Sequence, residues 1–356
     1  MSIVAHTRPF VVGVDAHART HALAVLACPT GEVLDEAQFP ATTAGLARAV
    51  AWVARRTGAD LDALWVIEGV GTYGARLARA AADAGYAVAE APRMNARANR
   101  GVGKSDPLDA RRIAQAAVPL DHTQLRLPRT DEGARAALRI LIASRDHITN
   151  ERTAAINALI ALLRVVDLGI DARGTLNTGR ISEIAAWRAR AEELSIGVAR
   201  AEAVRLAKRV RTADRELGDL TRQMTALLNE SPAAGLLDQP GIGPVTAAIA
   251  YAAWSHPGRI RSEAAFASLA GVNPIPASSG NTVRHRINRG GDRRLNRALH
   301  MAVVTRMRMD PETRAYVDKR TAQGRTPREI RRSLKRYLAR QIYRQLNATI
   351  TPAAAA

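Results

Sequence analysis

The sequence predicts a mixed α/β N-terminal domain, followed by a pair of long helices and a mostly α-helical C-terminal domain. Short apolar runs of β-strand type occur up to residue 91, where they alternate with helical patterns. From residue 131 onward the apolar spacing is helical and the strand-like runs stop. A stretch rich in Gly, Asp and Asn at 167–179 divides this helical part. These three observations set the order of the domains.

Three strand-like runs open the N-terminal domain, at residues 10–14, 21–27 and 33–39. The tetrapeptide from Cys28 to Gly31 predicts a hairpin turn between the second and third runs. The pattern then continues as a helix from residue 43, a strand at 64–67, a helix at 73–84, a strand at 86–91 and a helix at 106–117. This is the order of a ribonuclease-H-like fold, in which helices pack on one mixed sheet. We expect this domain to span residues 8–128.

The next two helical stretches, 131–163 and 181–229, predict an antiparallel coiled-coil arm over residues 129–230. The C-terminal domain, residues 231–347, begins with Gly-Ile-Gly-Pro at 241–244 between two helical patterns. This arrangement is typical of a helix-hairpin-helix, whose glycines let backbone amides approach phosphates at a helix N-terminus. An ordinary tight helical turn would give the same pattern.

Charge predicts a polyanionic partner. The chain has 356 residues, enough for two or three domains, and a net charge of +19. Residues 284–344 alone hold 19 Lys and Arg against 5 Asp and Glu. A GC-rich genome that favours Arg is the alternative explanation, but it does not account for local clustering. The pattern favours a nucleic acid, because phosphate neutralisation supplies most non-specific affinity.

The composition also excludes several classes of protein. Cys28 is the single cysteine, which excludes an intrachain disulfide framework and a cysteine-based zinc site. No apolar run approaches the roughly 20 residues of a membrane span. The N-terminus lacks the features of a secretory signal, so we expect a cytoplasmic protein without a membrane partner.

Two glycine-containing motifs predict nucleotide binding at first sight. The motif ending in Gly103-Lys104-Ser105 lacks the first glycine of a P-loop, because Ala98 stands there. Gly69, Gly71 and Gly74 form a full G-x-G-x-x-G between a strand and a helix, with Glu90 about 20 residues on. Glu68 beside this turn would repel a pyrophosphate, and three strands of antiparallel type precede the unit. These two points weaken the case for a dinucleotide site, but the motif is complete, so a dinucleotide-dependent oxidoreductase remains an alternative.

Four carboxylates occupy positions that can converge. Asp15 and Glu68 each end an apolar strand, and Asp106 and Asp109 lie three residues apart at a helix start. Four such groups would repel one another unless divalent cations neutralise them. Two Mg²⁺ ions, or Mn²⁺, about 4 Å apart would do so and would clamp a phosphodiester.

Each acid also has a structural interpretation of its own. Asp15 would simply end its strand, and Glu68 would cap the helix after it. Asp106 before Pro107 is a favourable helix N-cap, and Asp109 would favour the helix dipole. His17 and Lys104 lie beside the acids in the sequence, where they could touch substrate phosphate or merely face solvent.

The ordered set of motifs resembles a known family. The acids stand in VGVDAH, WVIEGVGTYG and KSDPLDARRIA; the C-terminal half contains PGIGPVTAAIA, FASLAGVNPIPASSGN and RHRINRGGDRRLNRALH. Over residues 11–344 this resembles the DEDD transposases of the insertion-sequence family numbered one hundred and ten. The resemblance implies a RuvC-like N-terminal domain, a coiled-coil arm and a transposase domain with a catalytic serine. It also implies Mg²⁺-dependent recombination of donor and target DNA, guided by a bridge RNA that the element encodes. The implied assembly is a tetramer that combines the acids of one protomer with the serine of another.

The serine that matches the family motif is Ser279, directly before Gly280, and its neighbour Ser278 is the alternative. A serine that attacks phosphorus would hold the strand as a covalent phosphoserine ester. Basic residues nearby could bind the phosphate and its developing charge. The residues that we expect to bind nucleic acid are Lys104, Arg284, Arg286, Arg289, Arg293, Arg294 and Arg297.

The sequence thus predicts an RNA-guided DNA recombinase with catalytic acids and a serine nucleophile. Three alternatives stay open. One is a metal-dependent junction nuclease that uses only the acids. The others are the dinucleotide-dependent oxidoreductase and a nucleic-acid-binding protein without catalysis.

Overall fold

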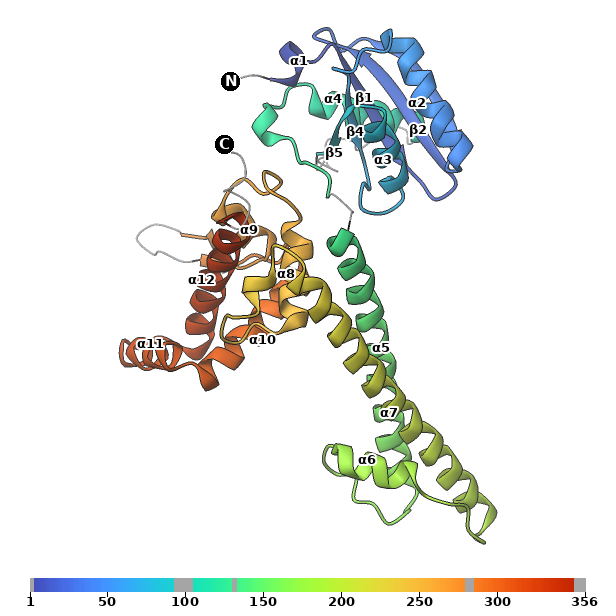
Figure 1. The fold of residues 1–356 in the computed structure, drawn as a ribbon, viewed down its shortest axis with the longest axis vertical. Coiled ribbons are helices and arrows are strands. Elements are labelled where there is room, and N and C mark those ends of the chain that lie inside the picture. Colours follow the sequence, from blue (N-terminus) through green and yellow to red (C-terminus); the bar gives the residue numbers. More distant parts are fainter. Residues whose placement is uncertain (1–2, 93–104, 130–132, 279–284, 349–356) are drawn as a thin grey trace. The chain divides into compact units, whose positions relative to one another are not determined.

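The computed structural model describes residues 3–92, 105–129, 133–278 and 285–348 (Figure 1). The chain divides into two compact units, Met1–Thr130 and Asp131–Ala356. Among the helices of the described residues, none is both long and apolar enough to cross a membrane.

The N-terminal unit is built on a mixed five-stranded sheet with the strand order β3-β2-β1-β4-β5. Its strands are β1 (Phe10–Ala16), β2 (Thr20–Ala27), β3 (Val33–Pro40), β4 (Leu64–Ile67) and β5 (Ala87–Glu90). The first three pair antiparallel, whereas β1–β4 and β4–β5 pair parallel. The predicted hairpin between β2 and β3 is confirmed. The parallel strand β4 has to reach β1 by a helical crossover, which the helix between β3 and β4 supplies.

Helices cover both faces of this sheet. They are α1 (Val4–Thr7), α2 (Thr43–Thr57), α3 (Ala75–Asp83) and α4 (Asp106–Ala117), with a 3₁₀ turn at His122–Gln124. Because side chains alternate along a strand, Val12 and Val14 face the core shared with α2 and α3. Val11 faces the opposite core, which contains Ile113 of α4 and Val4 of α1. A mixed α/β domain with helices on one mixed sheet, as predicted, is confirmed.

Gly13 allows α4 to lie directly against the centre of the sheet. It belongs to the same face of β1 as Val11, and α4 packs on β1 and β2. A Cβ atom at Gly13 would lie 2.1 Å from the carbonyl oxygen of Ala110 and 2.7 Å from the backbone nitrogen of Ala114. No side chain fits in that space, so the glycine sets the distance between the helix and the strand.

The second unit begins with two long helices, α5 (Gly133–Val165) and α7 (Leu194–Asn229), which pack against each other. Leu138 near the start of α5 shares a core with Leu228 at the end of α7. Leu163 near the end of α5 shares another with Ala203 near the start of α7. The two helices therefore run antiparallel. A short helix, α6 (Thr178–Ala185), packs on α7 through the second of these cores.

The expected continuous helix over 181–229 is wrong, because residues 186–193 leave the helical path between α6 and α7. Tertiary contacts hold this connection in place. The guanidinium of Arg200 lies 5.0 Å from the ring centroid of Trp187 and pairs with the carboxylate of Glu192. The Glu193 side chain accepts a hydrogen bond from the Ser195 backbone N–H and so caps α7. No Gly or Pro marks this break, so the sequence pattern does not reveal it.

The other elements of this unit are the 3₁₀ turn Ala234–Leu236, α8 (Pro244–Trp254), α9 (Glu263–Leu269), β6 (Pro274–Pro276), β7 (His285–Ile287), α10 (Arg293–Met309), α11 (Pro311–Ala322) and α12 (Pro327–Ala348). The 3₁₀ turn, α8, α9, α10 and α12 share one core with the adjoining ends of α5 and α7. Every residue of α8 from Ala247 to Trp254 is buried, as expected of a helix that is apolar all round. It contacts α5, α7, α10 and α12.

The expected helix-hairpin-helix is wrong in its first arm. Before Gly241 the chain forms turns and a 3₁₀ helix of three residues, where the pattern requires a helix. Gly241 has a φ of +74°, and a Cβ there would lie 2.6 Å from the carbonyl oxygen of Ala302 on α10. The Arg306 Nε also donates to the Pro240 carbonyl oxygen at 2.6 Å. Close packing on α10 therefore explains this glycine without a phosphate.

The contact between α4 and β1 makes a testable prediction. Gly13→Ala should lower the free energy of unfolding by about 1–3 kcal/mol, because the added methyl group forces α4 off the sheet. A urea titration followed by circular dichroism measures the shift in midpoint. Gly71→Ala is the matched control, because a Cβ at Gly71 meets nothing within 4 Å. Equal midpoints for Gly13→Ala and the wild type would show that the helix adjusts without cost.

Candidate active site

The site lies where β1 ends and α4 begins. Asp15 is the penultimate residue of β1 and belongs to the same face of the strand as Gly13, the face that α4 covers. Its side chain is only about 10% exposed. The Glu68 backbone N–H donates to the Val14 carbonyl oxygen at 2.9 Å, so the parallel pairing of β1 and β4 extends to this level.

Asp106 is the first residue of α4, and the preceding Ser105 takes the N-cap position without a side-chain cap hydrogen bond. The interpretation of Asp106 as the N-cap is therefore wrong by one residue. Asp106 and the buried Ala110 are four residues apart and share one face of the helix. Because Ala110 packs at Gly13, the same face of the helix carries Asp106 toward the end of β1. The Asp106 carboxylate does not cap the helix, since Ser105 is the N-cap residue.

His17 lies between the two carboxylates. Its Nε2 is 3.0 Å from Oδ2 of Asp15 and 3.5 Å from Oδ1 of Asp106. The three side chains offer ligand atoms that all lie within 4.8 Å of one another. From the sequence, His17 was expected only to contact phosphate or to face solvent. The Asp-x-His spacing at a strand end, which places both side chains on one face, is the signal that could have identified it.

The electrostatics of Asp15 call for a positive partner. Burial raises the pKa of the Asp15 carboxyl above its ordinary value, and the nearby Asp106 and Asp109 raise it further, while His17 opposes both effects. A bound cation would act as His17 does, but with a greater charge. Carboxylate oxygens that converge beside an exposed opening fit a hard divalent ion, and the imidazole nitrogen is compatible with Mn²⁺.

The other two predicted acids lie outside this group of three. Asp109 is 19% exposed and accepts a hydrogen bond from Arg112 Nη1 at 2.9 Å, although it is close enough to act on the pKa of Asp15. Glu68 is exposed in the turn that follows β4. The structure thus brings Asp15 and Asp106 together, with Asp109 near them.

The glycines after Glu68 have a packing role. Gly69 has a φ of +65°, and its carbonyl oxygen accepts hydrogen bonds from the N–H groups of Thr72 and Gly74. A Cβ at Gly74 would lie 2.7 Å from the Glu68 carbonyl oxygen and 2.8 Å from Cγ2 of Ile67. A tight turn between β4 and α3 therefore explains two of the three glycines of the G-x-G-x-x-G motif without a dinucleotide.

In the sequence, the predicted serine falls in the connection between β6 and β7. Pro276 of β6 pairs with His285 of β7, so the two ends of the connection that contains Ser279 are neighbours. Ser278 is exposed just after β6. Ser279, Lys104 and Arg284 lie outside the described residues.

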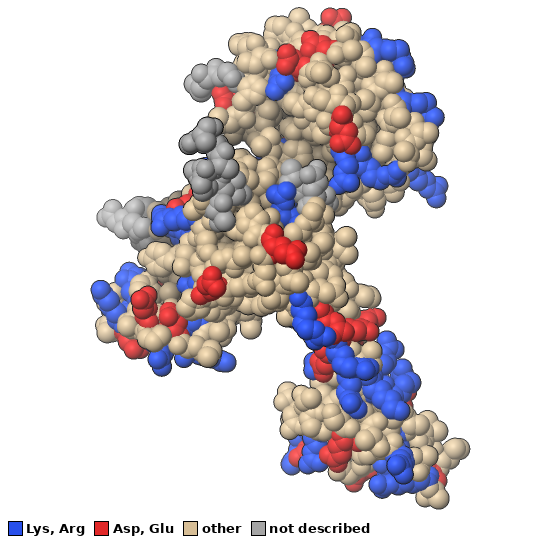
Figure 2. Space-filling model, viewed as in Figure 1, with Lys and Arg blue, Asp and Glu red and all other residues tan. Residues whose placement is uncertain are grey.

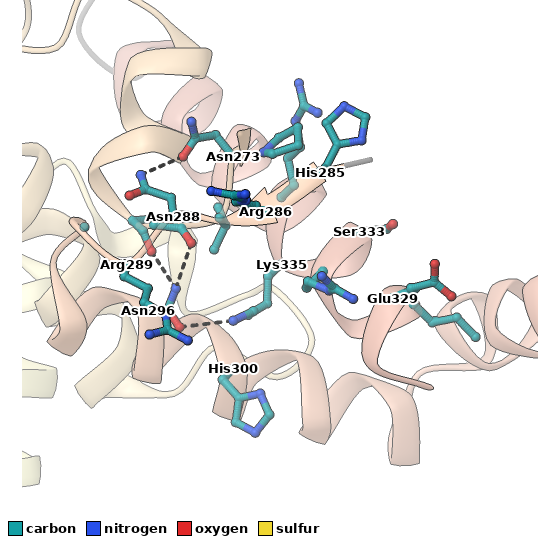
Figure 3. Close-up of a pocket in the computed structure, with 18 of the residues that line it drawn as sticks. Asn273, His285, Arg286, Asn288, Arg289, Asn296, His300, Glu329, Ser333 and Lys335 are labelled. Carbon is teal, nitrogen blue, oxygen red and sulfur yellow. Dashed lines mark hydrogen bonds between the residues drawn. The ribbon is translucent and has the colours of Figure 1, made fainter. Parts of the chain in front are cut away.

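Most of the other predicted basic residues line one pocket of about 1120 Å³ in the second unit (Figure 3). These are Arg286, Arg289, Arg293 and Arg297. Asp146 of α5 holds Arg294 Nε at 2.7 Å and Arg297 Nη2 at 3.1 Å. Figure 2 shows that Lys and Arg side chains also gather along the paired helices α5 and α7.

Residues of α11 and α12 complete this pocket, and no motif in the sequence marks them. They include Arg320, Arg332, Lys335 and Arg336. The excess of positive charge over 284–344 was the available signal, but a count of charges does not show which side chains meet in the fold.

Two family models match the chain. Residues 12–166 match the DEDD transposases of IS110 type, described as a transposase, and residues 233–318 match "Transposase IS116/IS110/IS902 family". The first match contains all four predicted acids, and the second contains Ser279.

Two relatives agree with this assignment. The "Insertion element IS110 uncharacterized 43.6 kDa protein" of Streptomyces coelicolor is 27% identical over 345 residues, which covers 84% of each chain. The "Insertion element IS900 uncharacterized 42 kDa protein" of Mycobacterium paratuberculosis is 28% identical over 274 residues, covering 63% of this chain and 67% of the relative. The first matched region covers most of the α/β unit and the whole of α5, the second lies in the helical unit, and the chain belongs to the IS110 family of transposases.

Proposed function

We propose that this transposase cuts and rejoins DNA strands with two centres, a divalent-metal centre at the acids and a serine nucleophile at Ser279. The observation that supports the metal centre is the convergence of Asp15, His17 and Asp106 at the C-terminal end of β1. Asp15 and Asp106 come from segments far apart in the sequence, and β1 alone does not require a buried acid at its end. Membership of the family supports the metal assignment.

Asp15 and Asp106 would hold the ion, with Glu68 and Asp109 as further ligands. When bound, Mg²⁺ or Mn²⁺ neutralises these carboxylates and polarises a phosphodiester oxygen. The chain itself supplies the orientation. β1 fixes Asp15 in a largely buried position, and the start of α4 fixes Asp106 opposite it. His17 orients the Asp15 carboxylate by a 3.0 Å hydrogen bond.

In the second centre, the Ser279 hydroxyl attacks phosphorus of the DNA backbone. A bond forms between Oγ and phosphorus, and one P–O ester bond of the strand breaks. The serine hydroxyl gives its proton to a base, and the departing strand end takes up a proton and becomes a free hydroxyl. The phosphoserine ester keeps the energy of the broken bond for the joining of a second strand. Arg286, Arg289 and Arg293 are suited to hold the phosphate oxygens on which charge develops. The neighbouring Ser278 is the alternative nucleophile.

We further propose the domain types, the nucleic-acid partners and the tetramer that the family resemblance implies. The strand order β3-β2-β1-β4-β5 supports a RuvC-like domain, and the antiparallel pair α5–α7 supports a coiled-coil arm. The net charge of +19 supports binding of donor and target DNA together with a bridge RNA. A tetramer would let the acids of one protomer act with the serine of another.

A metal-dependent nuclease that uses only the acids is the second candidate. The convergence of Asp15 and Asp106 is common to both candidates. They differ in whether the protein forms a covalent bond to DNA, so an experiment on the serine separates them.

The acid centre is tested by Asp15→Asn and Asp106→Asn in recombination of a donor plasmid with a target plasmid. Removal of a group that only contacts a metal ligand lowers metal affinity or activity by about 10- to 100-fold. Each of these two variants should lower recombination by more than that, because each removes a proposed ligand itself. EDTA should abolish activity of the purified protein, and Mg²⁺ or Mn²⁺ should restore it. Asp83→Asn, an exposed carboxylate on α3, is the control. Full activity of both site variants would exclude the metal centre.

The serine centre is tested by trapping a protein–DNA adduct on a denaturing gel. The wild type and Ser278→Ala should give an adduct, and Ser279→Ala should give none, because only its Oγ forms the ester. An adduct that disappears with Ser278→Ala instead would move the nucleophile by one residue. DNA cleavage by the wild type without any adduct would favour the nuclease.

RNA guidance is tested by supplying the transposase with and without the non-coding flank of its element. Recombination should require the flank, because the target information would lie in RNA and not in the protein. Supplying the flanking transcript from a separate plasmid should restore activity. Equal recombination without the transcript would contradict guidance.

A further inference from the structure

The C-terminal helix α12 forms a pocket together with the paired strands β6 and β7. Pro274 of β6 and His285 and Arg286 of β7 form one wall, and Arg332, Lys335 and Arg336 of α12 form another (Figure 3). The family-model match ends at residue 318, so α12 lies outside it.

Lys335 is a lining residue of this pocket whose position is fixed by a hydrogen bond. Its side chain is half-buried, and Nζ donates to Oδ1 of Asn296 at 3.1 Å, as Figure 3 shows. Asn296 is fixed in turn, because its Nδ2 donates to the carbonyl oxygens of Ala270 at 2.7 Å and Gly271 at 3.3 Å. The ammonium group is thus held in one place at the base of the pocket.

The use of lysine at this position is unusual for this chain. Lysine occurs at residues 104, 208, 319 and 335, whereas nearly all other cations are arginine. Lys208 and Lys319 are exposed, and Lys335 is half-buried against α10. A compact ammonium with three rotating donors suits such a position better than a planar guanidinium does.

The charge of the pocket is not balanced within it. Of the described residues that line it, Glu329 alone is acidic, and it is 3.7 Å from Arg325. Burial lowers the pKa of Lys335 from its ordinary value, and Arg332 and Arg331 lower it further. Burial also lowers the pKa of His300, and the charges of Lys335 and Arg331 lower it further. An anion bound among these groups would relieve their mutual repulsion.

The dimensions of the pocket restrict the anion. Its volume of about 1120 Å³ suits a ligand larger than a free phosphate ion and is too small to enclose a double helix. Val272 and Pro274 give it apolar surface beside the cations, which suits a base or sugar next to a phosphate. A short piece of unpaired strand has this combination of groups.

We propose that the pocket between the β6–β7 hairpin and α12 binds the backbone of an unpaired nucleic-acid strand, with Lys335 as the residue that fixes one phosphate. The proposal deepens the proposed function, because a strand held here lies against β6 and β7, the strands whose connection in the sequence contains Ser279. DNA and RNA share the phosphodiester, and the experiment below distinguishes them.

The test is binding of the full-length protein to labelled single strands of about 12 nucleotides, measured by fluorescence anisotropy over a series of salt concentrations. DNA, RNA of the same sequence and the DNA duplex are compared. Lys335→Ala should weaken single-strand binding about tenfold and make the salt dependence shallower by about 0.7, the value for one lost phosphate contact on a single strand. Arg336→Ala, which changes an exposed side chain of the pocket, should act in the same direction.

Lys319→Ala is the matched control, since it removes the same charge from α11 outside the pocket. It should change affinity by no more than about twofold. Equal losses for Lys319→Ala and Lys335→Ala, or an equal Lys335 dependence for the duplex, would overturn the proposal. The single strand whose affinity depends on Lys335 identifies DNA, RNA or both as the ligand.

The binding assay needs no strand cleavage, so it also separates this proposal from the proposed function. Ser279→Ala should bind single strands as the wild type does. Retained recombination by Ser279→Ala would overturn the serine mechanism and leave the pocket standing. A thermal melt of each variant verifies that loss of binding does not come from unfolding, and Arg336→Ala decides the matter if Lys335→Ala is unstable.

Discussion

The backbone-to-backbone approach of α4 and β1 at Gly13 determines the geometry of the acid centre. The carbonyl oxygen of Ala110 lies where the side chain of any other residue at position 13 would begin. This contact fixes the height of α4 above the sheet and the level at which the helix begins. Asp106, one turn before Ala110, therefore lies opposite Asp15, two residues after Gly13. The acids need no direct attraction to meet, because the packing of small residues brings them together.

The repulsion between the acids is the cost of this arrangement. Apolar side chains on both faces of the sheet are buried in the two cores that sandwich it, and this burial favours the fold whatever the state of the carboxylates. His17 reduces the repulsion through its hydrogen bond to Asp15. A fold tolerates an aspartate pair of this kind when its other interactions stabilise it by more than the repulsion costs, and when the solvent or the protein supplies a counter-charge.

Much of the N-terminal unit was predictable because its signals are local. Alternation and turn residues identified the five strands, and the position of each acid at a strand end or helix start identified Asp15 and Asp106. His17 was underestimated because the path of the turn after β1 depends on backbone pairing. The break at 186–193 and the missing helix before Gly241 depend on contacts such as Arg200 with Trp187 and Gly241 with Ala302. Contacts between distant residues leave no periodic pattern in the sequence. The charge excess predicted a polyanion, but not that Lys335 and Arg286 share one cavity.

The position of α12 in the sequence has a consequence for biosynthesis. Leu338, Ile342 and Leu346 of this helix complete the core that begins with Leu138 on α5. The unit Met1–Thr130 contains all residues of its own cores and is free to fold as it leaves the ribosome. The second unit must wait for α12, which is translated after every other element of its core. A nascent chain therefore carries a finished acid centre for some time before the basic pocket exists, and a transcript broken upstream of α12 would encode a product that never acquires it.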